Sequence, residues 1–120
     1  MSPVSIPSED TQKLTLSRLE RYAKKHYIGR RGIKEIRGHF KGNHLFLEVV
    51  KETRAGLVGR LFKMGDVRGI GRLARLEYLG PNKWKFLIYS YEVQKYTTHK
   101  TFREGDIEEC LAAAGKVYLV

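Results

Sequence analysis

The sequence predicts an α+β fold: an N-terminal helix, an antiparallel sheet of about five strands and a C-terminal helix. Residues 9–27 and 106–115 place apolar side chains at helical spacing, whereas several segments between them alternate apolar and polar residues with the period of two expected of strands. Turn signals at residues 42–43 and 80–83 join consecutive strands by short connections. At 120 residues we expect one domain, 9–120, preceded by a disordered lead-in at 1–8.

The first helix is predicted at residues 9–27. Ser8 supplies a capping oxygen, two acidic residues follow it near the positive end of the helix dipole, and Gly29 provides a stop signal. An apolar face is formed by Leu16, Leu19, Ala23 and Tyr27. On another side, three cations at helical spacing predict one exposed basic stripe, which is either a ligand surface or a solvated face: Arg18, Arg21 and Lys25.

Residues 33–41 and 44–51 are predicted to form a hairpin around Gly42-Asn43, a pair suited to a tight turn. The second strand has one apolar face, made by Leu45, Leu47 and Val49, and a mixed outward face. Residues 53–71 carry five glycines that interrupt any period, so we expect a long basic loop. Such a loop suits phosphate contacts through Arg60, Lys63, Arg68 and Arg72, although an ordinary surface excursion has the same composition.

Residues 72–79 are rich in helix formers but alternate in polarity, and the alternation favours a strand. The next strand, 84–92, has apolar or aromatic bulk on both faces and is expected to be central. A further strand is predicted at 94–102. The second helix begins with Asp106 and Glu109, which resemble a capping box, and ends at Gly115. Cys110 lies on its apolar face and is expected to be core; 117–120 would form a short strand or extended tail.

The C-terminal fifty residues resemble a known bacterial family. The resemblance rests on Ala74-Arg75 with Tyr78, on Trp84-Lys85, on Lys95-Tyr96 and on the acidic-started helix at 106–111. These segments are similar to the domain-of-unknown-function family numbered three thousand and twenty-four. The sequence departs from the family pattern at Leu87, Ile88, Ser90, Tyr96 and His99. The resemblance implies a strand at 72–79 and an architecture, but no activity.

Charge narrows the class of partner. Lys and Arg outnumber Asp and Glu by 23 to 13, a net charge of +10, so a polyanion or an acidic protein is the expected partner.

Cysteine content and hydropathy bear on the location of the protein. A single cysteine excludes an intramolecular disulfide, and the sequence has no apolar run of membrane-spanning length. A cytoplasmic location without a membrane partner is therefore expected. Four His residues and one Cys lack the paired spacing of zinc sites, and we expect no metal or cofactor.

The leading functional hypothesis is a non-catalytic nucleic-acid-binding domain, with RNA and DNA both open. Aromatic side chains among cations on an antiparallel sheet are typical of single-strand recognition. One alternative is a metal-independent ribonuclease of toxin type, in which Lys95, Tyr96, His99 and Arg103 form the site, with Lys95, His99 and Arg103 on one strand face. Another is a module that docks on an acidic protein. The expected nucleic-acid contacts are Arg18, Arg21, Lys25, Arg30, Arg31, Arg60, Lys63, Arg68, Arg72, Lys85, Tyr89, Tyr91, Lys95 and Tyr96.

Overall fold

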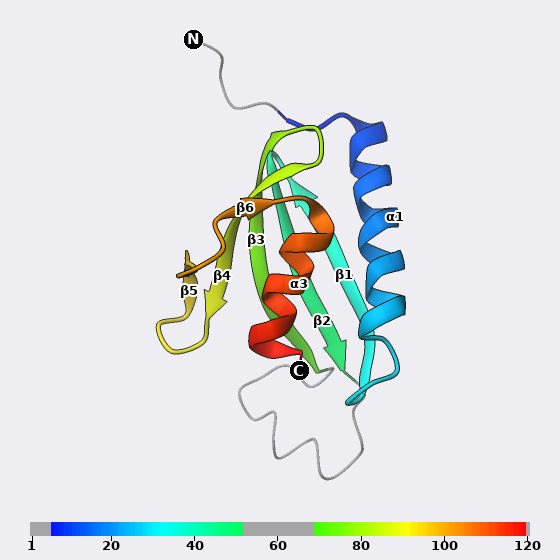
Figure 1. Cartoon of the computed structure of the whole chain (residues 1–120), viewed down its shortest axis with the longest axis vertical. Helices are drawn as coiled ribbons and strands as arrows, with labels where there is room; N and C mark the ends of the chain where they lie inside the picture. The colour runs from blue at the N-terminus through cyan, green and yellow to red at the C-terminus, as the bar shows by residue number, and fades with distance from the viewer. Residues whose placement is uncertain (1–5, 52–68, 120) are drawn as a thin grey trace.

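The computed structural model describes residues 6–51 and 69–119, and it has the predicted α+β architecture. An N-terminal helix, an antiparallel sheet and a C-terminal helix follow one another along the chain. The sheet has the order β1-β2-β3-β4-β5, and the short strand β6 pairs with β4 beside β5. In Figure 1, α3 lies in front of the sheet and α1 runs beside β1. Leu19 of α1 and Leu111 of α3 belong to the same core cluster as Leu45 of β2, so both helices cover the same face. The fold therefore has two layers, with the core between helices and sheet.

Helix α1 spans Glu9–His26 and is capped as predicted. The Ser8 hydroxyl accepts a hydrogen bond from the backbone N–H of Thr11, 3.1 Å away, which satisfies one of the free amide groups of the first turn. Leu19 and Ala23 are buried against the sheet. The helix ends at His26, and Gly29 in the following turn has φ of 87°, a left-handed conformation that glycine adopts without strain.

Five strands form a meander in which each strand pairs with its neighbour in the chain. Their bounds are β1 Ile33–Lys41, β2 His44–Lys51, β3 Ile70–Gly80, β4 Lys83–Ser90 and β5 Lys95–Thr98. The predicted hairpin of β1 and β2 and the strand assignment at 72–79 are confirmed, and β4 is internal, as expected. The two-residue strand β6 spans Glu104–Gly105 and pairs with the start of β4.

The prediction of one strand over 94–102 is wrong, because the chain turns after Thr98. The cause is His99, whose ring Nδ1 lies 3.3 Å from the backbone nitrogen of Thr101 and 3.2 Å from that of Phe102, and accepts from both. A side-chain acceptor that binds the backbone locally competes with the strand ladder. Lys95 and Arg103 are consequently on different segments.

Helix α3 spans Ile107–Tyr118 and begins with the predicted capping box. The Asp106 carboxylate accepts from the backbone N–H of Glu109 at 2.8 Å, and the Glu109 carboxylate accepts from that of Asp106 at 2.9 Å. The helix continues through Gly115 to Tyr118, so the predicted end at Gly115 is wrong, and the predicted extended segment is wrong at 117–118. A methyl group at Gly115 would lie 2.6 Å from Cζ of Tyr27, which shows that the glycine admits this ring rather than ending the helix.

The core lies between the helices and one face of the sheet. Leu45, Leu47, Leu76, Trp84 and Phe86 are buried from the sheet side. Cys110 is also buried, and its surroundings raise the pKa of the thiol, mainly through desolvation, so the prediction that it belongs to the core is confirmed. Within the described residues, no helix combines the length and apolar character needed to cross a membrane.

Candidate nucleic-acid interface

The second face of the sheet, opposite the two helices, is the candidate interface, and we call it the open face. Alternation along each strand decides which residues belong to it: Phe46 and Glu48 of β2 point away from Leu45 and Leu47, which are core. Cross-strand pairing extends this assignment over the neighbouring strands. The open face comprises Glu35, Arg37, His39, Lys41, His44, Phe46, Glu48, Val50, Ile70, Arg72, Arg75, Glu77, Lys85, Leu87, Tyr89, Tyr96 and Thr98.

Aromatic rings form a continuous cluster at the centre of this face. The ring centroids of Phe46 and Tyr96 are 5.8 Å apart, although two strands separate β2 from β5, so these side chains lean toward each other. Tyr96 is 4.9 Å from Tyr89, its cross-strand partner, and Phe46 stacks on His39 at 5.3 Å. Phe46 and Tyr96 are partly exposed, whereas Tyr89 is only 6 % exposed. The cluster therefore offers two accessible rings on a buried aromatic base.

Two arginines of β3 lie against these rings. The guanidinium carbon of Arg75 is 5.3 Å from the centre of the Tyr96 ring, and that of Arg72 is 5.3 Å from the centre of the Tyr89 ring. Both distances are within the range of cation–π attraction. The Nε of Arg75 has no hydrogen-bond partner among the described residues. The rings thus hold two cations in place, and neither forms an ion pair with a described residue.

The charges of the open face favour an anionic ligand. Five cations, Arg37, Lys41, Arg72, Arg75 and Lys85, share it with three acids, Glu35, Glu48 and Glu77. Arg37 and Glu48 form an ion pair with 3.4 Å between Nε and Oε1. Burial raises the pKa of Tyr96, and the charge of Arg72 acts in the opposite direction. Tyr96 is accordingly a neutral phenol at neutral pH, suited to stacking rather than to proton transfer.

Tyr91 borders the open face, where it binds the backbone of β3. Its hydroxyl lies 2.6 Å from the backbone nitrogen of Arg72 and 2.7 Å from the Arg72 carbonyl oxygen, so it accepts from the first and donates to the second. The ring packs edge-on against Tyr89 at 4.8 Å. Burial is the main cause of the raised pKa of Tyr91. This side chain fixes the position of Arg72, while about half of its surface, 51 %, stays exposed.

The predicted cations of the first helix are not part of this face. Arg18 forms two hydrogen bonds with the carboxylate of Glu108 on α3, at 2.7 and 2.5 Å, so the predicted stripe of three exposed cations is wrong at this residue. Arg21 and Lys25 are exposed in the helix layer, and Arg30 and Arg31 lie in the turn that leads to β1. The predicted contacts at Arg60, Lys63 and Arg68 lie outside the described residues.

The structure brings some of the predicted contact residues of the sheet together. Arg72, Lys85, Tyr89 and Tyr96 lie on the open face, and Tyr91 borders it. Lys95 is exposed at the start of β5. Phe46, His39 and Arg75 were not predicted as site residues, although the alternation of Phe46 with Leu45 and Leu47 in β2 indicates that Phe46 points outward.

The residues of the alternative ribonuclease site do not share one strand, because β5 contains Lys95 and Tyr96 and ends before His99 and Arg103. His99 uses Nδ1 to accept from the backbone of its own turn, and Arg103 donates from Nε to the carbonyl oxygen of His99 at 2.9 Å. The predicted shared face of Lys95, His99 and Arg103 is wrong because the strand ends at Thr98. Tyr96 instead belongs to the aromatic cluster. These contacts assign His99 and Arg103 a structural role in the turn.

Comparisons with known proteins supply no further guide to the site. No family model, no curated protein and no solved structure matches the chain. Among the described residues, no group of three or more His, Cys, Asp or Glu side chains is arranged to hold a metal ion. The chemistry of the open face is therefore interpreted from its own geometry: stacking, cation–π contact and hydrogen bonding from guanidinium groups.

Proposed function

We propose that this protein binds single-stranded nucleic acid, without cleaving it, on the open face of its sheet. The observation that carries the proposal is the aromatic cluster of Phe46, Tyr96 and Tyr89, in which the guanidinium group of Arg75 lies against Tyr96 and that of Arg72 lies against Tyr89. Proteins that bind single strands combine aromatic rings, on which bases stack, with cations that follow the phosphate backbone. Both components occur here on one face.

Phe46 and Tyr96 are the stacking residues in this proposal. Each has an accessible ring supported from beneath or beside by another aromatic side chain, His39 for Phe46 and Tyr89 for Tyr96. A ring held by its neighbours loses little conformational entropy when a base stacks on it. The guanidinium groups beside the rings then contact phosphate oxygens, and Lys85 extends the cationic surface along β4.

Fluorescence anisotropy with labelled single-stranded RNA and DNA tests this proposal. Tyr96→Ala and Phe46→Ala are each expected to weaken binding by about 1–3 kcal/mol, the usual contribution of one stacked base. Arg75→Gln is compared with Arg21→Gln, which removes the same charge from the helix layer. If binding is confined to the open face, Arg75→Gln should clearly weaken the affinity for nucleic acid, and Arg21→Gln should weaken it much less.

The salt dependence gives a second readout. If three cations of the open face, Arg72, Arg75 and Lys85, contact phosphates, the slope of log K against log salt is about −2 for a single strand, and a fourfold rise in salt weakens binding about twentyfold. Equal losses for Arg75→Gln and Arg21→Gln would show that only net charge matters. Undiminished binding by both alanine variants would exclude the stacking surface.

A further inference from the structure

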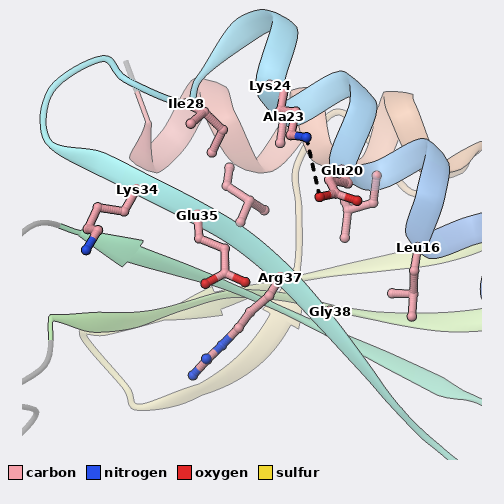
Figure 2. A pocket seen from close by; sticks show the side chains of 11 residues that line it. Leu16, Glu20, Ala23, Lys24, Ile28, Lys34, Glu35, Arg37 and Gly38 are labelled. Atoms are coloured by element: carbon pink, nitrogen blue, oxygen red, sulfur yellow. Dashed lines mark ion pairs between the residues drawn. The ribbon is translucent and has the colours of Figure 1, made fainter.

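A groove lies on the helix side of the sheet, between helix α1 and the edge strand β1 (Figure 2), and it meets the open face at Glu35 and Arg37. Its volume is about 280 Å³. One face of α1, carrying Leu16, Glu20 and Ala23, forms one wall, and residues 34–38 of β1 form the other. Ile28, in the turn after the helix, closes one end. The groove runs along residues 34–38 of β1.

The strand beside the groove has a free edge. β1 stands at the end of the sheet order and pairs with β2 alone among the described strands. Gly38 brings the helix close to this edge, since a methyl group there would lie 3.2 Å from Leu19 Cδ2 and 3.3 Å from Leu16 Cδ2. An added strand would thus hydrogen-bond to β1 and lie against α1, the arrangement by which several peptide-binding domains extend a sheet.

The interior and the rim of the groove differ in chemistry. The interior is apolar, with Leu16, Leu19, Ala23, Ile28 and Ile36. Glu35 and Arg37 extend from β1 on the side away from α1 in Figure 2, toward the open face. Glu20 and Lys24 on the helix side neutralise each other, with 3.7 Å between Nζ and Oε2. Along the edge and in the turn before it, the chain carries one acid, Glu35, and five cations, Arg30, Arg31, Lys34, Arg37 and Lys41. Arg37 is paired with Glu48 of β2, and the other four cations give the rim its positive charge.

We propose that this groove binds an extended segment of an acidic partner protein, which adds as a strand to the edge of β1. Side chains alternate along a strand, so one set of the partner's side chains faces the apolar interior beneath α1 and the other lies beside the cations of the edge. The matching segment alternates apolar and acidic residues. The opposite charge of the rim gives specificity and a fast association rate, and the backbone hydrogen bonds give affinity.

A labelled peptide of alternating valine and glutamate, about as long as the 9 residues of β1, is the probe. We expect the full chain to bind this peptide, as measured by fluorescence polarisation. It should not bind a peptide of alternating valine and lysine. Lys34→Glu with Lys41→Glu should weaken binding about tenfold. The matched control, Lys95→Glu with Lys100→Glu, makes the same charge change beyond β4 and should leave binding unchanged.

Peptide N-methylation tests the strand addition itself. Only every second residue of an added strand donates its N–H to the edge, so methylating one alternate set should abolish binding, whereas methylating the other set should be tolerated. Equal behaviour of the two methylated peptides, or absence of binding at about 1 mM, overturns the proposal. Equal losses in the two charge-reversed proteins also overturn it. A dimer seen by sedimentation and abolished by Lys34→Glu with Lys41→Glu would assign the edge to a second copy instead.

Discussion

The ion pair of Arg18 and Glu108 joins the two helices, and its removal gives the sharpest test of how they are held together. Nε and Nη2 of Arg18 donate to the two carboxylate oxygens of Glu108 at 2.7 and 2.5 Å. Both side chains are 28 % exposed. Hydrogen bonding to Glu108 is the main cause of the raised pKa of Arg18. The perturbation is Arg18→Met, which keeps the apolar stem, combined with Glu108→Gln.

The expected coupling follows from this geometry. Fully exposed pairs contribute about 0.2–1 kcal/mol, and hydrogen bonds to charged groups about 1.5–3 kcal/mol. A bidentate pair with most of its surface covered lies between these limits, so we expect a coupling of about 1.5 kcal/mol. Each single substitution should cost about 2 kcal/mol, because it also leaves a partly buried charge without its partner. For Glu108→Gln, the lost interaction with the α3 dipole adds to this cost.

Urea unfolding of the parent, the two single variants and the double variant measures the coupling as a double-mutant cycle. Removing a coupling of about 1.5 kcal/mol corresponds to a fall in Tm of about 6 °C for a chain of this length. The coupling should fall in 1 M salt without vanishing, since the pair is partly shielded. A coupling below about 0.3 kcal/mol would refute the conclusion that this contact holds α1 and α3 together.

Two further predictions concern buried positions. Because burial raises the pKa of Cys110 above its ordinary value of 9.0, the unfolded chain loses its thiol proton first, so stability should fall above pH 9 by at most about 1.4 kcal/mol per pH unit. The urea midpoint should fall less steeply with pH in Cys110→Ala than in the parent protein. Parallel pH profiles of the two proteins would contradict this prediction. Gly115→Ala should destabilise by about 1–2 kcal/mol in thermal melts despite the better helix propensity of alanine, because the methyl group overlaps Tyr27. The same change in a Tyr27→Ala background should be neutral or stabilising, and an equal loss there would disprove the clash.

Local signals predicted most of the fold. The caps at Ser8 and Asp106 involve residues three positions apart, and the strand at 72–79 follows from a period of two that outweighs its helix formers. The strand predicted at 84–92 ends at Ser90, and two larger errors in element bounds have tertiary or side-chain causes. Gly115 looks like a helix stop signal in the sequence. In the structure, the ring of Tyr27 occupies the space that a side chain at position 115 would fill. His99 ends β5 through its own ring nitrogen, an interaction that strand periodicity does not report.

The candidate site was harder to predict because it depends on strand order. Phe46 and Tyr96 are 50 positions apart in the sequence, and they meet only because the meander places β3 and β4 between them and their side chains lean together. Arg18 also shows that local spacing does not predict a contact between distant parts of the sequence. Its helical spacing grouped it with other cations, whereas its partner, Glu108, is 90 residues away.

The order of elements along the chain has a consequence for synthesis on the ribosome. Each strand of the meander can pair with one already made, and α1 is available to cover β1 as soon as that hairpin forms. Among the described residues, the core around Trp84 and Phe86 is completed only when Ile107 and Leu111 of α3 have emerged. The nascent chain therefore presents a large aromatic surface late in translation, which is the interval in which it is most open to chaperone binding and to aggregation.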